Sequence, residues 1–299
     1  MSRILISGLV NTETTVRVRQ FPIPYYPIDY PFFGVGTAAS GVGYNLSAAL
    51  RSLGDQVTLL SMTGDDFSAQ LVRQELQKLG VETGGIRSCL RETPASVALY
   101  DEEGKRQIYC DLKDIQETDY GFTPQVCNQA DLVIACNINY NRPLLKAAKE
   151  AGKTIATDVH VLRDIHDDYN RDFMAAADIL FLSDEGIGED YRGFLTQLGQ
   201  TYHNRIIVLG RGRKGAAMHI PKTGAFHELP AVKIGKVVNT VGAGDALFGA
   251  FLHYHATGLK PLEALKRAQI FASAKIRVSG ASKGFITARE VDEFYHNFY

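Results

Sequence analysis

The chain has 299 residues, of which 45% are hydrophobic and 22% charged, an ordinary composition for a soluble globular protein with one large core or two unequal domains. Its formal net charge of −1 argues against a dedicated nucleic-acid-binding protein. The sequence has no apolar run of membrane-spanning length and no signal peptide at its start, so we expect a cytoplasmic protein that does not enter a membrane.

The N-terminal part of the chain predicts strands followed by polar residues. Residues 3–8 form a short apolar run that ends in glycine, which is typical of a buried strand. Asn11-Thr12-Glu13 follows at the carboxyl edge of that strand, where open α/β sheets bind ligands. Glu13 by itself is compatible with a ligand contact or with a polar turn. The alternation in residues 15–19 predicts a further strand with one solvent-exposed face.

Residues 21–33 are rich in proline and aromatic residues. The prolines exclude a helix or a central strand, so the aromatic side chains are expected to cover a substrate, a partner subunit or the edge of the domain. A second interpretation is a ligand for a proline-recognition domain, because Pro24-Tyr25-Tyr26-Pro27 fits PxxP.

The rest of the chain alternates between apolar strands and amphipathic helices. Helical spacing is found in residues 42–53, 67–79, 143–152 and 262–276, and strand-like runs in residues 57–60, 131–135, 153–157, 178–182 and 205–209. This alternation predicts a mainly parallel sheet with helices on both faces. Residues 95–100 and 106–110, joined by residues 101–104, predict a β-hairpin instead.

A glycine-rich segment, Gly210-Arg211-Gly212-Arg213-Lys214-Gly215, matches GxGxxG after a strand. A dinucleotide-binding turn must open a helix, whereas residues 216–221 predict a second strand, so we reject an NAD-binding oxidoreductase. The basic side chains either attract ATP phosphates or form a solvated turn. The phosphate-loop pattern GxxxxGK[ST] does not occur in the sequence.

Residues 237–251 contain a glycine turn, Gly242-Ala243-Gly244, that opens a helix of small and apolar residues. An anion could reach the backbone N–H groups of this turn, and the positive end of the helix dipole would favour it. Asp245 lies at the same place, where it would take a proton from a hydroxyl that attacks a phosphate. The alternative is an ordinary helix start with an acidic residue in its first turn.

Two motifs in the expected order resemble the ribokinase-like (PfkB) carbohydrate kinase family: Thr240-Val241-Gly242-Ala243-Gly244-Asp245, and residues 40–54 with Gly41, Gly43 and Asn45. The resemblance covers nearly the whole chain. It implies a three-layer α/β fold with a mainly parallel central sheet and a small β-sheet lid, through which such proteins often form homodimers. We expect residues 1–13, 37–94 and 113–299 in the nucleotide- and substrate-binding domain, and residues 14–36 and 95–112 in the lid.

The resemblance also implies the roles of individual residues. Asp245 would be the catalytic base at the acceptor hydroxyl, and the amides of Gly242, Ala243 and Gly244 would stabilise the phosphoryl group. The expected sugar contacts are Asn11, Glu13, Gly41, Gly43 and Asn45. The expected nucleotide contacts are Gly210, Gly212, Gly215, Thr240, Gly242 and Gly244. The 262–276 helix and residues 280–282 would line the adenine pocket.

The residues that are expected to bind metal ions differ from those of the family. Ser183 and Gly186 replace the Asn and Glu that help to place Mg²⁺, which leaves Asp184 or Glu185 to act through water, with Asp184 as the expected ligand. Asn239 replaces an Asp near the anion-binding turn, and this loss of charge weakens or abolishes a site for a monovalent cation such as K⁺. The Asp and His residues of segment 158–167 match no standard metal pattern. The four cysteines lack CxxC spacing and are expected to be reduced and buried: Cys89, Cys110, Cys127 and Cys136.

Together these features predict an enzyme, a kinase that uses ATP and Mg²⁺ to phosphorylate a sugar hydroxyl, with a primary hydroxyl as the expected acceptor. Two alternatives remain at this point. A nucleoside kinase of the same fold would stack a base on the aromatic residues of segment 25–33. A non-catalytic sugar- or nucleotide-binding regulator would explain the altered residues Ser183, Gly186 and Asn239.

Overall fold

The structure, a computed structural model, describes residues 1–299 except 104 and 124. Its main sheet contains β1 (Arg3–Ser7), β4 (Gln56–Thr63), β5 (Ile86–Ser88), β8 (Leu132–Ala135), β9 (Thr154–Val161), β10 (Ile179–Ser183), β11 (Ile206–Gly210), β12 (Ala216–Ile220) and β13 (Ala225–Leu229). The order of these nine strands is β13-β12-β11-β10-β9-β8-β1-β4-β5. Neighbouring strands are parallel except at the β11–β12 and β12–β13 pairs, so the expected mainly parallel sheet is confirmed.

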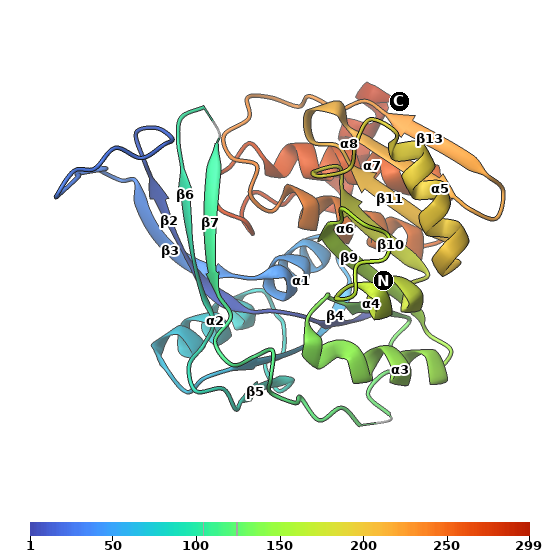
Figure 1. Ribbon diagram of the computed structural model, residues 1–299, viewed down its shortest axis with the longest axis horizontal. Coiled ribbons are helices and arrows are strands. Elements are labelled where there is room, and N and C mark those ends of the chain that lie inside the picture. Colours follow the sequence, from blue (N-terminus) through green and yellow to red (C-terminus); the bar gives the residue numbers. More distant parts are fainter. Residues whose placement is uncertain (104, 124) are drawn as a thin grey trace.

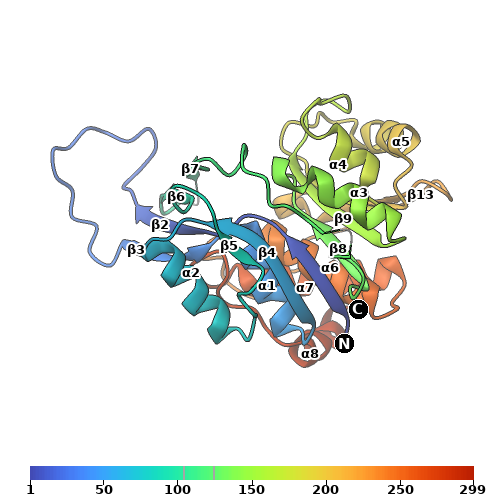
Figure 2. The same cartoon turned by 90° about the horizontal axis from the view of Figure 1, so that it is seen from below.

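Helices cover both faces of this sheet. One face carries α1 (Val42–Ser52), α2 (Phe67–Lys78), α6 (Ala243–Ala256), α7 (Pro261–Lys275) and α8 (Ala288–Phe298), and the other carries α3 (Arg142–Glu150), α4 (Arg171–Ala176) and α5 (Tyr191–Tyr202). Successive residues of a strand point to opposite faces, so Ile4 and Ile6 pack in the first core and Leu5 packs in the second. Figure 2 shows α3, α4 and α5 on one side of β8 and β9, with α6 and α7 on the other. The three-layer α/β fold is therefore confirmed.

A smaller sheet stands beside the main one (Figure 1). It contains β2 (Asn11–Arg17), β3 (Val35–Ser40), β6 (Ala95–Tyr100) and β7 (Arg106–Asp111), in the order β3-β2-β6-β7. The antiparallel β6–β7 pair is the predicted hairpin; Gly104 of its connection lies outside the described residues. Asn11 and Glu13 belong to β2 itself, so the interpretation of Glu13 as part of a polar turn is wrong. We call this four-stranded sheet the small sheet; its role as a lid stays a prediction.

The segment between β2 and β3 projects away from the rest of the molecule (Figure 2). Tyr25, Phe32 and Phe33 have 88%, 77% and 109% of their surface exposed, so within a single chain they do not cover the edge of the domain. Tyr26 lies under the guanidinium of Arg19, 4.6 Å from the ring centroid. The aromatic residues are therefore available to a substrate or a partner.

None of the described helices is both long and apolar enough to cross a membrane. All four cysteines are free, as expected, but only Cys127 and Cys136 are buried. Cys89 and Cys110 are exposed, because they lie in a loop after β5 and on the last strand of the small sheet.

Candidate active site

The glycine turn before α6 has a backbone conformation that depends on its first glycine. Gly242 has φ +77°, in the left-handed region, and a Cβ there would collide with the carbonyl oxygen of Ala281. Asn239 shapes the same turn, because its Oδ1 accepts a hydrogen bond of 2.7 Å from the N–H of Val241. The N–H of Ala243 donates to the carbonyl oxygen of Thr240 at 3.2 Å. The other first N–H groups of the helix have no partner within it, so the start of α6 can offer donors to an anion. We refer to residues 239–244 as the anion turn.

Asp245 lies in the first turn of α6 and contacts a residue 200 positions earlier in the chain. Asn45 Nδ2 donates a hydrogen bond of 2.7 Å to Asp245 Oδ2. Burial raises the pKa of Asp245, and the Asn45 amide and the nearby charges of His160 and Lys275 oppose that shift. An oriented carboxylate with a raised pKa is suited to accept a proton from a hydroxyl. The structure thus brings together both motifs from which we identified the family resemblance.

Asn11, Glu13 and Asn45 form a polar group with unused hydrogen-bonding capacity. Asn11 Nδ2 donates to Ser96 Oγ at 3.1 Å, whereas the buried Oδ1 atoms of Asn11 and Asn45 have no hydrogen-bond partner among the described residues. Burial and, to a lesser extent, the charge of Asp245 raise the pKa of Glu13. Buried polar atoms without partners are rare in folded proteins, so a ligand with several hydroxyl groups would suit this group.

Gly41 and Gly43 have a structural reason to be glycine. Gly41 has φ +98°, and a Cβ there would lie 2.5 Å from the carbonyl oxygen of Leu9. A Cβ at Gly43 would lie 2.8 Å from the carbonyl oxygen of Gly8. Both glycines therefore let the start of α1 pack directly on the backbone after β1, which sets the position of Asn45. Contact of these glycines with a sugar stays a prediction.

The GxGxxG segment joins β11 and β12 as part of an antiparallel hairpin rather than opening a long helix. A single 3₁₀ turn, η2 (Gly212–Lys214), lies between the strands. This confirms the rejection of a dinucleotide-binding turn. Arg211 stacks on Tyr191, 4.3 Å from the ring centroid, and its Nη1 lies 3.5 Å from Glu228 Oε2, so Arg211 is engaged within the protein. Contact of Gly210, Gly212 and Gly215 with a nucleotide stays a prediction.

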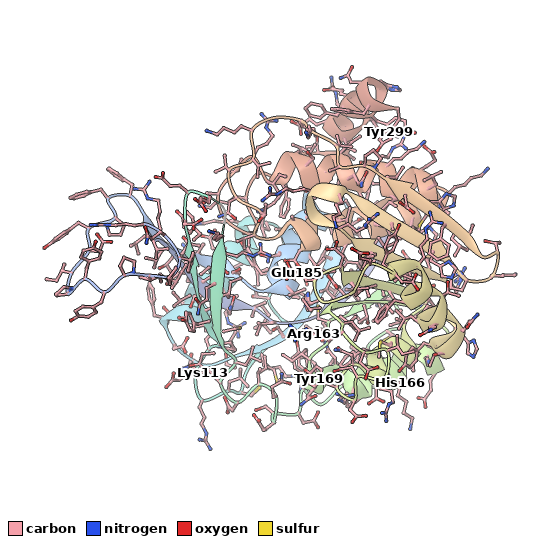
Figure 3. The ribbon with its side chains drawn as sticks, turned by 45° about the horizontal axis from the view of Figure 1, so that its top comes forward. Lys113, Arg163, His166, Tyr169, Glu185 and Tyr299 are labelled. Carbon is pink, nitrogen blue, oxygen red and sulfur yellow. The ribbon has the colours of Figure 1, made fainter. Side chains whose placement is uncertain are left out.

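The loops after β9 and β10 lie beside each other. A Cβ on Gly186 would meet the side chain of Arg163 at 2.8 Å, and Figure 3 shows Glu185 and Arg163 close together. Asp184 donates its N–H to the carbonyl oxygen of Gly210 at 2.9 Å. In the described part of the chain, no group of three or more His, Cys, Asp or Glu side chains is placed to hold a metal ion.

The Asp and His residues at the end of β9 lie near the proposed base. His160 has φ +58° and donates its N–H to Asp158 Oδ1 at 2.8 Å. The charges of both side chains act on the pKa of Asp245, His160 lowering it and Asp158 raising it. Instead of a metal site, this segment provides part of the electrostatic surroundings of Asp245.

Two basic residues at the site were not singled out by the sequence. Lys275, the last residue of α7, is fully buried and donates from Nζ to the carbonyl oxygen of Val241 in the anion turn. Burial lowers the pKa of Lys275 to about 8, although Asp245 and Glu13 favour its charged form. Arg106, at the start of β7, donates from Nη1 to Thr240 Oγ1 at 3.3 Å and so connects the small sheet to the anion turn. The only signal for Lys275 was a lysine among the apolar and small residues of a predicted helix.

A cleft of about 220 Å³ lies between the small sheet and the loop after α7. Glu13, Phe33 and Tyr100 line it from one side, and residues 279–283 line it from the other. Glu13 connects this cleft to the start of α6, since the charge of Asp245 acts on the pKa of Glu13. A cleft near an acidic side chain at a helix start of an α/β protein is the arrangement expected of a phosphotransferase.

The comparisons with known proteins agree with this class. The sequence matches the pfkB family carbohydrate kinase over residues 4–288, so the chain belongs to that family and is a sugar or nucleoside kinase, a phosphotransferase with an alcohol acceptor. It is 26% identical over 300 residues to an ATP-dependent ribose-1-phosphate kinase of Halopiger xanaduensis, covering 98% of this chain and 96% of that relative.

Other relatives fit the same family. A nucleoside kinase of Methanocaldococcus jannaschii is 23% identical over 269 residues, covering 86% of this chain and 85% of the relative. A structure of Arabidopsis thaliana ribokinase complexed with ribose and ATP superimposes with a TM-score of 0.79 at 20% identity, covering 98% of both chains. The ribokinase-like fold is therefore shown, and kinases of this family use ATP.

Proposed function

We propose that this protein transfers the γ-phosphoryl group of ATP to a sugar hydroxyl, with a primary hydroxyl as the preferred acceptor. The observation that carries the proposal is the Asn45–Asp245 hydrogen bond at the anion turn. Beside it, the buried side-chain oxygens of Asn11 and Asn45 lack hydrogen-bond partners within the described part of the chain. A sugar offers several hydroxyl donors to such oxygens, whereas a purely apolar ligand would leave them unpaired.

The proposed chemistry is an in-line displacement. The acceptor oxygen forms a bond to the γ-phosphorus while the bond to the bridging β,γ-oxygen breaks, ADP leaves, and the hydroxyl proton passes to Asp245. The amides of Gly242, Ala243 and Gly244 stabilise charge on the phosphoryl oxygens. Positioning and electrostatics contribute most of the acceleration, because phosphoryl transfer has a loose transition state.

Magnesium is compatible with the residues present. Mg²⁺ typically reaches a kinase on the substrate phosphates and uses only one or two carboxylates of the protein. This agrees with the absence of a metal-binding cluster among the described residues. Asp184 is the side chain that would hold the ion, through water, and Mg²⁺ would neutralise charge on the ATP oxygens.

A panel of acceptors tests the proposal. ADP release would be measured with ribose, ribose 1-phosphate, fructose, hexose acids and adenosine at saturating MgATP. We expect turnover with at least one sugar and little with adenosine. Preference for adenosine would favour a nucleoside kinase, for which Phe33 is the supporting observation, because this exposed ring lines the cleft where a base could stack. Calorimetric sugar binding without ATP turnover would identify a regulator instead.

Arg106→Gln should weaken substrate binding without affecting folding. Arg106 connects the small sheet to Thr240. Because this contact is exposed to solvent and therefore weak, we expect the KM for the substrate to increase by only about two- to fivefold. Lys105→Gln is the matched control, because Lys105 is the neighbouring exposed cation and pairs with Glu103 at 2.8 Å instead. Equal KM values in both variants would contradict the assigned role of Arg106.

We also propose that the protein forms a homodimer through the small sheet and the loop beside it. The support is the exposed aromatic surface of Tyr25 and Phe32, which association with a second copy would remove from water. A Tyr25→Ser, Phe32→Ser double variant should sediment as a monomer at concentrations where the wild type is a dimer. A monomeric wild type would contradict the proposal.

A further inference from the structure

Lys275 is a buried lysine in direct contact with the anion turn. None of its surface is exposed, and its Nζ donates to the carbonyl oxygen of Val241, three residues before Gly244. Lysine is almost never fully buried unless its charge is compensated, because removing an ammonium from water is costly. Its position therefore requires an explanation beyond the packing of α7.

The groups around Lys275 account for its charge. Asp245 of α6 and Glu13 of β2 favour the ammonium form, whereas burial and Arg106 of β7 oppose it. With a pKa of about 8, most of the lysine is protonated at neutral pH. A fixed positive charge therefore lies next to the turn where the proposed function places the phosphoryl group.

The residues of the turn do not fit a monovalent cation. Asn239 Oδ1 accepts from the N–H of Val241, and the carbonyl oxygen of Val241 accepts from the ammonium of Lys275, so one lone pair of each oxygen is already used. A cation would need such oxygen atoms as ligands, and the ammonium would also repel it. The positive charge that the family resemblance assigns to K⁺ can therefore come from the side chain of Lys275.

We propose that Lys275 is a tethered cation: its ammonium holds the Val241 carbonyl, keeps the anion turn in its phosphate-binding conformation and makes the protein independent of K⁺. This inference rests on the proposed function for the identity of the anion. Lys275 is a positioning residue, because it acts through the turn and its electrostatic field rather than by contact with the acceptor.

The first test measures binding, so it does not depend on turnover. MgATP affinity would be determined by calorimetry in potassium chloride and in choline chloride at a constant ionic strength of about 0.15 M. We expect the wild type to bind equally in both salts. Lys275→Met, which keeps the length and loses the charge, should bind about tenfold or more weakly in both salts. Lys275→Ala, which leaves space for an ion, should bind weakly in choline and recover in potassium.

The control is Lys260→Met, which removes an exposed lysine at the other end of the same helix and should leave affinity unchanged. Thermal unfolding of each variant shows that it is folded. Wild-type affinity or turnover that rises severalfold with K⁺, or an unchanged affinity in Lys275→Met, would overturn the inference. If the binding results agree but no acceptor is phosphorylated, the proposed function fails and the tethered cation stands.

A pH series separates this role from a structural one. The folded pKa of about 8 lies below the ordinary value of 10.5, so between these values the unfolded chain binds more protons. The contribution of Lys275 to stability therefore rises as pH increases through this range. MgATP affinity should fall over the same range, because the charge is lost. In Lys275→Met both trends should be absent; an unchanged alkaline loss of affinity in this variant would contradict the role.

Discussion

Asp245→Asn should lower kcat by about a hundredfold or more and leave the affinity for MgATP nearly unchanged. The amide has nearly the same shape as the carboxylate and can still contact Asn45, so the anion turn is preserved. It cannot take the proton of the attacking hydroxyl. The loss should therefore appear in the transfer step rather than in nucleotide binding.

Single-turnover kinetics and calorimetry of MgATP would measure the two quantities separately. Asp168→Asn provides the matched control, because the side chain of Asp168 is 87% exposed and pairs with Arg171 on the surface. Turnover of Asp245→Asn within twofold of the wild type would remove the assigned role. Parallel loss of ATP affinity and kcat would mean that the charge of Asp245 mainly supports the turn.

Gly244→Ala should abolish most activity while slightly stabilising the protein. Apart from its chain neighbours and the backbone of its own helix, no atom of the described residues lies within 4 Å of a Cβ built on Gly244, so the fold accepts the methyl group. Alanine in a helix gains up to about 1 kcal/mol over glycine. In the proposed function, the phosphoryl group approaches the backbone through the open space beside Gly244. The methyl group would occupy that space and weaken nucleotide binding.

Gly242→Ala is the contrasting change in the same turn. Its φ of +77° costs about 1–2 kcal/mol for a residue with a Cβ, and the collision with Ala281 adds to that cost. Thermal unfolding with MgATP calorimetry would distinguish the two variants: Gly242→Ala should lose stability, whereas Gly244→Ala should lose only function. A fully active Gly244→Ala would show that the phosphoryl group does not bind at this turn.

The fold was largely predictable because its signals are local. Apolar runs and helical spacing each depend on neighbouring residues, and they correctly indicated β1, β4, α1, α6 and the β6–β7 hairpin. The rejection of a dinucleotide-binding turn also depended on adjacent residues, since residues 216–220 form β12. The exposure of the aromatic segment was not predictable in this way, because it depends on what the loop contacts in space.

Only those residues of the candidate site that belong to a sequence motif could be predicted. Asp245 and Asn45 each belong to a motif, but their contact spans 200 residues and required the folded chain. The residues next to Lys275 in the sequence do not indicate its proposed role. That role follows from its burial and from its hydrogen bond to the Val241 carbonyl, which are seen only in the folded chain. The same holds for Arg106. A basic residue in a hairpin is expected to be solvated, and only the folded structure shows its contact with Thr240 of the anion turn.

The order of strands in the main sheet has a consequence for synthesis of the protein. β1 lies between β4 and β8, so the sheet can start from its N-terminal half, while α6 is added from the last third of the chain. A nascent chain that ends before residue 245 lacks the carboxylate that Asn45 holds. If Asp245 is the base, as proposed, phosphoryl transfer begins only after this long-range contact forms, and contacts of this kind are the slowest to assemble. The time at which activity appears during translation or refolding would thus report when the contact between Asn45 and Asp245 forms.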